Sequence, residues 1–255
     1  MELARLAAPA GLKQLEGFLL VAGPEPEILA LLTEGFCGWG AGFLQDEWQQ
    51  DVLERGGDGA AAVASARAAL GRCARYAAWQ LRGPLARVFE LPLDDATRAL
   101  AAASARDATP LYWLTTAHAV LLGMTGELSL ALRAPRMLAV LRRVNELAPA
   151  LEHGQAHALL GALLAAIPVL GDLDEAAREL ERARQLSGGR LLTVDVLAAR
   201  SYAVARGDHA LFVSLLTSVL ARSPAAMPEQ RLANELAQRT ARRYLRYGAR
   251  WFSAR

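Results

Sequence analysis

The sequence predicts an all-α fold of stacked antiparallel helical hairpins, and three observations lead to this prediction. Hydrophobic residues make up 53% of the 255 residues, and alanine and leucine, which are strong helix formers, dominate. The alternation of β-branched and polar residues that is typical of strands is almost missing. Proline and glycine interrupt the chain at intervals that suit helix ends. We expect one domain over residues 1–255.

The N-terminal half contains predicted helices bounded by proline and glycine. Pro24 and Pro26 start a stretch with apolar residues at helical spacing, which runs to about Gln49, because proline suits the first turn of a helix. Three glycines between residues 56 and 59 then break the chain. A poorly patterned connection runs from Pro84 to Pro92, and further helices are predicted over residues 60–81, 110–124 and 135–147.

The C-terminal half contains the clearest internal repeat. Two Gly-Asp turns begin at Gly171 and Gly207, so their spacing is 207 − 171 = 36 residues. Asp172 and Asp208 are expected to cap the helices that follow with their side-chain oxygens. Helix-ending signals repeat at distances of 39 and 36 residues, at Pro149, Gly188 and Pro224. Such a period, with a short turn inside each unit, is typical of divergent tetratricopeptide-like helix pairs.

Each predicted hairpin leaves an apolar flank uncovered, so several must stack and the ends of the stack need caps. The last helix, residues 228–247, is predicted to be the C-terminal capping helix. Its small residues recur every four positions and let it approach its neighbour closely, at Ala233, Ala237 and Ala241. A helical array of this kind usually presents a groove that binds partners or ligands.

The charge balance argues against several classes of function. The formal net charge is +2, with 28 basic and 26 acidic residues, which is too even for a nucleic-acid partner or a general membrane-surface protein. Lys13 is the only lysine, which nearly excludes a phosphate-binding loop, and no G-x-S-x-G motif is present. Asp94 and Asp95 are expected to cap a helix that begins near Ala96. We therefore expect no enzyme activity and no cofactor.

Two apolar stretches approach the length of a membrane span. Residues 108–126 lack charge but include threonines and a histidine, and residues 158–171 are too short and contain Pro168. Both are expected to be buried helices. The N-terminal residues lack the basic start and long apolar run of a signal peptide.

Histidine and cysteine were considered as metal or redox groups. His153 and His157 are four residues apart, which places them on one face of a helix at a spacing that suits zinc. No third ligand accompanies them, so we expect a buried or hydrogen-bonded His157, an exposed His153 and no metal. Cys37 and Cys73 could meet across a hairpin, but two buried thiols are the default expectation.

The candidate binding residues are aromatic, arginine and asparagine side chains. The arginines of the last helix fall mostly on one side, which indicates a solvated face or, as the alternative, a surface for anions or an acidic partner. Asn234 lies beside the stripe of small residues and either ties helices together or binds a ligand. Arg190 follows the Gly188-Gly189 stop. The candidate set is Phe43, Trp113, Arg190, Tyr202, Asn234, Arg239 and Arg242.

The order of these signals resembles the TatT family, the T-component of tripartite ATP-independent periplasmic (TRAP) transporters. Residues 8–47, which include LKQLEGFLL, are similar to the opening helices of that family, and TPLYWLTTAHAVLLG at 109–123 is similar to its aromatic helix. The best match covers residues 145–203, followed by RLANELAQRTARRYL at 231–245. The ordered series of segments, and no single motif, carries the resemblance.

The resemblance implies a non-enzymatic, periplasmic, all-helical accessory protein of a TRAP-type uptake system. It implies association with the solute-binding P-component, a homotrimer, and a hydrophobic or carboxylate ligand. Many relatives carry an N-terminal lipid-bearing cysteine that is not present in this chain, so membrane contact is expected only through such an anchor. A general tetratricopeptide scaffold that binds peptide segments is the alternative.

Overall fold

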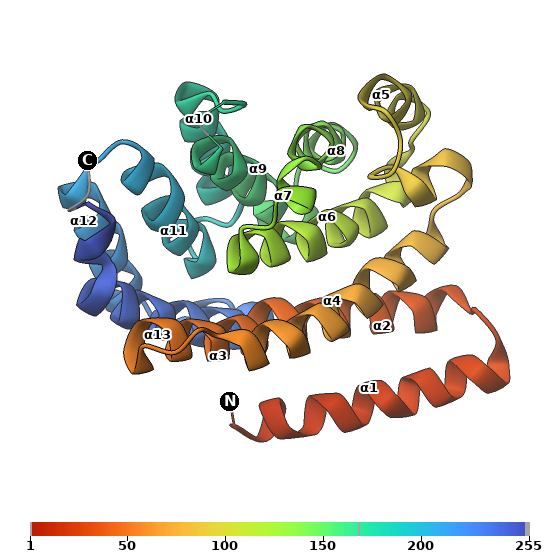
Figure 1. Cartoon of the computed structure of the whole chain (residues 1–255), viewed down its shortest axis with the longest axis horizontal. Coiled ribbons are helices and arrows are strands. Elements are labelled where there is room, and N and C mark those ends of the chain that lie inside the picture. Colours follow the sequence, from red (N-terminus) through yellow and green to blue (C-terminus); the bar gives the residue numbers. More distant parts are fainter. Residues whose placement is uncertain (1, 168, 253–255) are drawn as a thin grey trace. The chain divides into compact units, whose positions relative to one another are not determined.

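The computed structural model describes residues 2–167 and 169–252, and all regular structure within them is helical (Figure 1). The all-α prediction is therefore confirmed. The chain forms two compact units: unit 1 comprises Met1–Gln49 and Asp58–Ala148, and unit 2 comprises Gln50–Gly57 and Pro149–Arg255. The prediction of a single domain stays a prediction.

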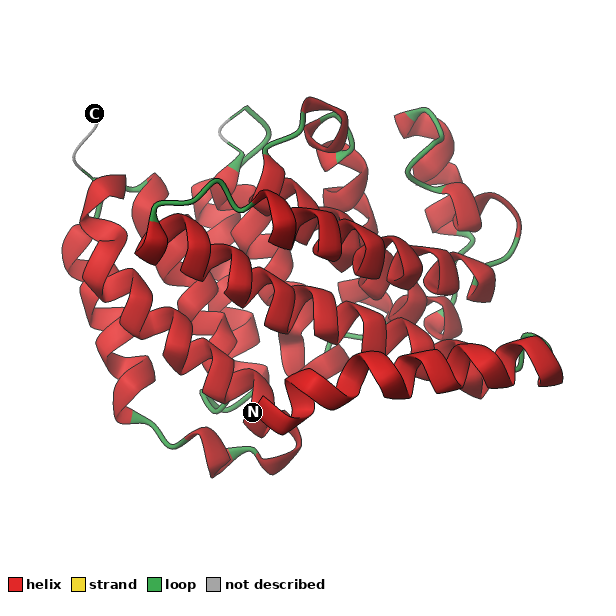
Figure 2. Ribbon diagram, turned by 60° about the horizontal axis from the view of Figure 1, so that its bottom comes forward, coloured by secondary structure: helices red, strands yellow, loops and turns green. Residues whose placement is uncertain are grey.

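Unit 1 is built from antiparallel helices joined by short loops (Figure 2). Helix α4 packs against both α2 and α6, α6 packs against α8, and α1 packs against α2. The elements are α1 (Glu2–Ala22), α2 (Pro26–Gly38), η1 (Trp39–Leu44), α3 (Gln45–Gln49), α4 (Ala60–Gln80), η3 (Gly83–Arg87), α5 (Leu93–Ala101), α6 (Ala105–Thr125), α7 (Leu128–Ala131) and α8 (Ala134–Leu147).

Unit 2 contains the repeated hairpins. Helices α9 and α10 pack together, as do α11 and α12, and α13 packs against both α11 and α12. The elements are η2 (Gln50–Arg55), η4 (Leu151–Gly154), α9 (Gln155–Ala166), α10 (Leu173–Leu186), α11 (Leu192–Ala198), η5 (Ala199–Ala203), α12 (His209–Ala221), η6 (Pro224–Ala226), η7 (Pro228–Gln230), α13 (Arg231–Tyr247) and η8 (Gly248–Trp251).

The predicted turns of the repeat are confirmed by their hydrogen bonds. The Asp172 carboxylate accepts from the backbone N–H groups of Asp174 and Glu175 at 2.8 and 3.0 Å, and Asp208 accepts from that of Leu211 at 2.9 Å. Each aspartate thereby satisfies N–H groups that have no partner inside the helix. Gly207 precedes the second cap with a φ of +66°, a left-handed conformation that glycine adopts without steric cost.

Helix α6 begins five residues earlier than predicted. The sequence analysis starts this helix at Pro110, whereas the structure starts it at Ala105 and places Pro110 inside it. A capping box explains the difference: the Ser104 backbone N–H donates to the Asp107 carboxylate at 2.9 Å, and Ser104 Oγ donates to it at 2.8 Å. These bonds fix the helix start upstream of the proline.

The segment that starts at Pro26 extends past the predicted end at Gln49. It runs as α2, η1, α3 and η2 to Arg55, and η1 and η2 are π-helical. Its last residues, 50–57, belong to unit 2, where η2 packs against α13. The predicted break at the following glycines is confirmed, since α4 begins at Ala60.

Cys37 and Cys73 form a disulfide between α2 and α4, with Cα atoms 5.2 Å apart. The expectation of two core thiols was therefore wrong. Both residues are fully buried in the core of unit 1, together with Leu32 and Leu70. Closing a loop of 36 residues stabilises a fold by about 3–4 kcal/mol in the chain-entropy account.

Two further expectations need correction. Asp94 and Asp95 lie in the first turn of α5 and not at its cap, which is Pro92; there they favour the helix through its dipole. His153 lies in η4 with a left-handed φ of +59°, and α9 begins only at Gln155, so His153 and His157 do not share a helix face. The predicted burial of His157 is confirmed, with its side chain 9% exposed. His153 is only half-buried, with its side chain 40% exposed, and not fully exposed as predicted.

The two apolar stretches fall on helices of the protein interior. Residues 108–125 lie in α6 and residues 158–166 in α9, and most of their side chains are buried. Pro168, which interrupts the second stretch, lies outside the described residues. Among the described residues, none of the helices combines the length and apolar character that a membrane crossing requires.

Candidate functional site

Most of the predicted binding residues lie in unit 2, where arginine side chains and buried polar groups join the ends of α10, α11, α12 and α13. Asp195 of α11 is 4% exposed. Its carboxylate accepts from Arg184 of α10 at 3.1 and 2.5 Å, and its other oxygen accepts from Arg222, which follows α12. Although burial lowers the pKa of Arg184, hydrogen bonding to Asp195 raises it above its usual range. This cluster fixes three helices relative to one another.

Asn234 is fully buried and connects α13 to the start of α11. Its side-chain oxygen accepts from the Leu192 N–H at 2.9 Å, and its amide nitrogen donates to the carbonyl oxygens of Arg190 and Pro224 at 3.0 and 3.3 Å. The backbone groups that it satisfies would otherwise be buried at a cost. This geometry is that of the predicted tie between helices, and it brings Asn234 and Arg190 together.

The arginines of α13 have different environments. Arg242 is exposed and Arg239 is half-buried. Arg243, which the sequence analysis groups with a solvated face, is 4% exposed, and its Nε donates to Glu54 of η2 at 2.7 Å. This hydrogen bond lowers the pKa of Glu54, against the opposing effect of burial. The solvated-face interpretation is therefore wrong for Arg243.

Tyr202 belongs to η5, a π-helical segment between α11 and α12. Its ring is half-buried and lies 5.5 Å from the guanidinium carbon of Arg206, whose Nη1 also donates to the Tyr202 hydroxyl at 3.4 Å. In the same segment the Arg200 guanidinium lies 4.3 Å from the Trp251 ring centroid. Cation–π contacts of this kind orient arginine side chains at a surface.

The remaining two predicted residues lie in unit 1. Phe43 of η1 is 6% exposed, and Trp113 of α6 is half-buried, with its ring centroid 4.8 Å from that of Tyr112. The Trp113 carbonyl oxygen lies 3.4 and 3.6 Å from the two disulfide sulfurs. The backbone of α6 at Trp113 therefore lies against the crosslink between α2 and α4.

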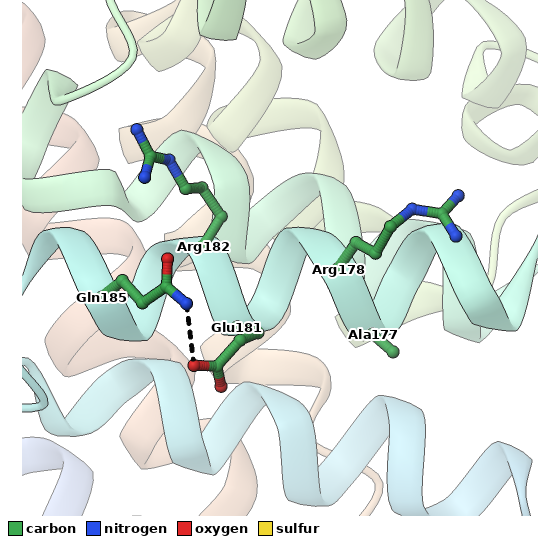
Figure 3. Close-up of a pocket in the computed structure, with 5 residues that line it drawn as sticks. All are labelled: Ala177, Arg178, Glu181, Arg182 and Gln185. Atoms are coloured by element: carbon green, nitrogen blue, oxygen red, sulfur yellow. Dashed lines mark hydrogen bonds between the residues drawn. The ribbon is translucent and has the colours of Figure 1, made fainter.

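A shallow depression of about 440 Å³ lies along α10 (Figure 3). Arg178 and Arg182 point to one side of the helix and Glu181 and Gln185 to the other. Glu181 accepts from Arg184 at 2.9 Å and from Gln185 at 3.2 Å. Two guanidinium groups one turn apart are suited to a carboxylate or another anion. The sequence analysis did not select these arginines, because charges on an amphipathic helix are expected to be solvated.

The histidines do not form a metal site. His157 Nδ1 lies 2.6 Å from Glu179 of α10, and burial lowers the pKa of His118 below its usual range. Within residues 2–167 and 169–252, no group of three or more His, Cys, Asp or Glu side chains could hold a metal ion.

Sequence reasoning missed the acidic partners Glu54 and Asp195. Asp195 carried a local signal, a single charge in the apolar run LLTVDVLAA, since an acid there is buried and must be paired. Glu54 carried none, because its partner Arg243 lies 189 residues away.

Comparison with protein families decides the affiliation. The profile of the TRAP transporter T-component family matches residues 1–252. The chain belongs to this family. No curated protein matches the sequence. Since T-components are accessory components of TRAP transporters, this protein has an accessory role in a TRAP transporter.

Proposed function

We propose that this T-component is a non-enzymatic periplasmic protein that binds the solute-binding P-component of its transporter. The observation that carries the proposal is the match of the T-component family to residues 1–252. The Cys37–Cys73 disulfide supports the location, because disulfides persist in oxidising compartments such as the bacterial periplasm.

The proposed docking surface is in unit 2 and includes Arg190, Tyr202, Arg239 and Arg242. Arg190 and Arg242 are exposed, and Tyr202 and Arg239 are half-buried. Asn234 positions Arg190 by donating a hydrogen bond to its carbonyl oxygen. In unit 1, Phe43 and Trp113 form the proposed apolar contact for a hydrophobic ligand. Arg178 and Arg182 of the α10 depression support a carboxylate group as the alternative ligand.

The family resemblance further leads us to propose a homotrimer built from divergent tetratricopeptide-like hairpins. The confirmed Asp-capped turns, 36 residues apart, support the repeat. Peptide binding by a general scaffold of this type is the competing function.

The decisive experiment is a calorimetric titration of the purified T-component with the P-component of its transporter. Binding in the micromolar range or tighter is expected, and Arg242→Glu should weaken it at least tenfold. Arg98→Glu is the matched control, because Arg98 is an exposed arginine on α5 of unit 1. Absence of any binding heat would refute the proposed partner. Equal effects of both variants would refute the proposed surface.

A further inference from the structure

His118 of α6 contacts two neighbouring segments of unit 1. Helices α7 and α8 both pack against α6 (Figure 1), and Arg133 lies at the junction between them. The ring of Phe89, which precedes α5 and is 6% exposed, has its centroid 4.6 Å from that of His118. Both ring nitrogens of His118 have a partner, one within α6 and one at the junction of α7 and α8.

The two partners of the imidazole fix its protonation state. Nδ1 lies 2.8 Å from the Leu114 carbonyl oxygen. Because a carbonyl oxygen can only accept, Nδ1 carries the proton. Nε2 lies 2.7 Å from Arg133 Nη1. Because a guanidinium group can only donate, Nε2 accepts with its lone pair. The geometry is therefore that of a neutral ring with its proton on Nδ1.

A second proton on His118 is incompatible with the Arg133 contact. This proton would bind at Nε2, where it would face an N–H of the guanidinium group and place two positive charges side by side. Burial and the charge of Arg133 lower the pKa of His118 below its ordinary 6.5, although the bond to Leu114 raises it. Protonation and the contact with Arg133 thus exclude each other.

Among the described residues, Arg133 is the charged group that acts on the pKa of His118. Other charged residues of the surrounding segments are bonded elsewhere or exposed. They are Arg67 of α4, which pairs with Glu127, Arg136 of α8, which donates to the Leu91 carbonyl oxygen, and the exposed Arg87 and Glu90 on the two sides of the Phe89 segment.

Arg133 is also part of the backbone that joins α7 to α8. Its N–H donates to the Leu130 carbonyl oxygen at 3.0 Å, and its own carbonyl oxygen accepts from Arg136 and Met137 at 3.0 Å each. We call residues 127–137 the α7–α8 corner. The Arg133 side chain is a polar tie between this corner and α6, and Leu130 and Met137, 7% and 0% exposed, are its apolar attachment.

We propose that His118 and Arg133 form a pH-operated latch, in which protonation of His118 releases Arg133 and loosens the α7–α8 corner from α6. Because folding lowers the pKa of His118, the contribution of the latch to stability is complete above pH 6.5 and is lost as the pH falls through the lowered pKa. The buried Leu130 and Met137 keep the corner attached, so the latch opens without unfolding unit 1.

Nuclear magnetic resonance of the imidazole nitrogens tests the latch directly. At neutral pH we expect a proton on Nδ1 and none on Nε2 of His118, and a titration with a pKa below 6.5. Arg133→Gln should raise this pKa, because it removes the neighbouring positive charge. Arg136→Gln is the matched control on the same helix and should leave the pKa unchanged. A proton on Nε2, or a pKa that does not respond to Arg133→Gln, overturns the proposal.

Hydrogen exchange tests the consequence for the corner. Protection factors of residues 127–137 should fall at least fivefold as the pH passes through the pKa measured for His118. His118→Gln, which is neutral at every pH, should abolish this fall, and Arg133→Gln should give the low protection at every pH. Circular dichroism verifies that the variants are folded, and the wild-type profile needs no variant. No fall in the wild type, or an equal fall in His118→Gln, overturns the proposal.

Discussion

The Glu16 carboxylate accepts hydrogen bonds from the Tyr76 hydroxyl at 2.7 Å, the Lys13 ammonium at 2.9 Å and Arg72 Nε at 3.1 Å. Burial alone would raise the pKa of Glu16, but the bonds from Tyr76 and Lys13 and the two positive charges lower it below its ordinary 4.5. Burial and the neighbouring carboxylate raise the pKa of Tyr76 to about 12. One side chain thus attaches α1 to α4.

Glu16→Gln should destabilise the protein by roughly 1–2 kcal/mol at pH 7, because hydrogen bonds to a charged carboxylate become bonds to a neutral amide. Since the pKa of Glu16 is lowered by folding, its contribution is present above pH 4.5 and is lost as the pH falls through the lowered pKa. Urea unfolding at pH 7 and pH 3 measures this. Glu146→Gln, at a carboxylate that is 64% exposed and pairs with Arg143, is the control and should change stability by less than about 0.5 kcal/mol. An equal loss at both pH values would contradict the assignment.

A second prediction at the scale of a single residue concerns Asn234. Asn234→Ala removes the partners of the Leu192 N–H and of two carbonyl groups at a fully buried position. The free energy of unfolding should fall by about 2–3 kcal/mol, because buried backbone groups lose hydrogen bonds. Thermal denaturation followed by circular dichroism measures the loss. Arg231→Ala, an exposed neighbour on α13, should leave the midpoint nearly unchanged, and similar midpoints for both variants would show that Asn234 does not tie the helices.

Helices pack most closely where glycine faces a neighbour. A Cβ at Gly161 of α9 would lie 2.8 Å from Leu180 Cγ and 2.9 Å from the Ala176 carbonyl oxygen, both on α10. A Cβ at Gly123 of α6 would meet nothing within 4 Å. The same residue type therefore has opposite roles in two helices.

Gly161→Ala should destabilise the protein by about 1–3 kcal/mol, because the added methyl group forces α9 and α10 apart. Gly123→Ala should instead stabilise it by about 0.5–1 kcal/mol, since alanine favours the helix and the space is open. Urea midpoints of the two variants give the comparison. Changes of the same sign in both would show that α9 and α10 do not approach as closely as described.

The boundaries of the helices were largely predictable, since they depend on neighbours within a few residues. The Asp172 and Asp208 caps act over two or three positions, and the helices predicted over 60–81 and 135–147 are confirmed to within one residue. The start of α6 was missed because Pro110 is a conspicuous start signal, whereas the Ser104–Asp107 box is a weaker pattern.

At the scale of the whole molecule, unit 2 is completed by a segment from early in the chain. Residues 50–57 supply Leu53 to the hydrophobic cluster of unit 2 and Glu54 to Arg243. The C-terminal capping helix therefore also packs against η2. A linear repeat, in which each hairpin contacts only its sequence neighbours, would not predict this packing.

Glu54→Gln should lower the stability of unit 2 by about 1–2 kcal/mol, because it removes the carboxylate charge opposite a guanidinium that is 3% exposed. The expected loss of stability is smaller than for a fully buried ion pair, because the Glu54 side chain is 33% exposed. Hydrogen exchange should show faster exchange in both η2 and α13. Glu235→Gln, whose partner Arg231 is exposed, is the control, and unchanged exchange in α13 would contradict the link.

The sequence by itself determined the helical class, the breaks between helices and the aspartate caps, and its ordered motifs indicated the T-component family. The tertiary structure alone decided that Cys37 bonds to Cys73, that Arg243 is buried against Glu54, and that Leu3 and Val21 of α1 are exposed. The reason is physical: propensities and caps act between residues a few positions apart, whereas burial and pairing depend on which distant helix faces each side chain once the core has formed.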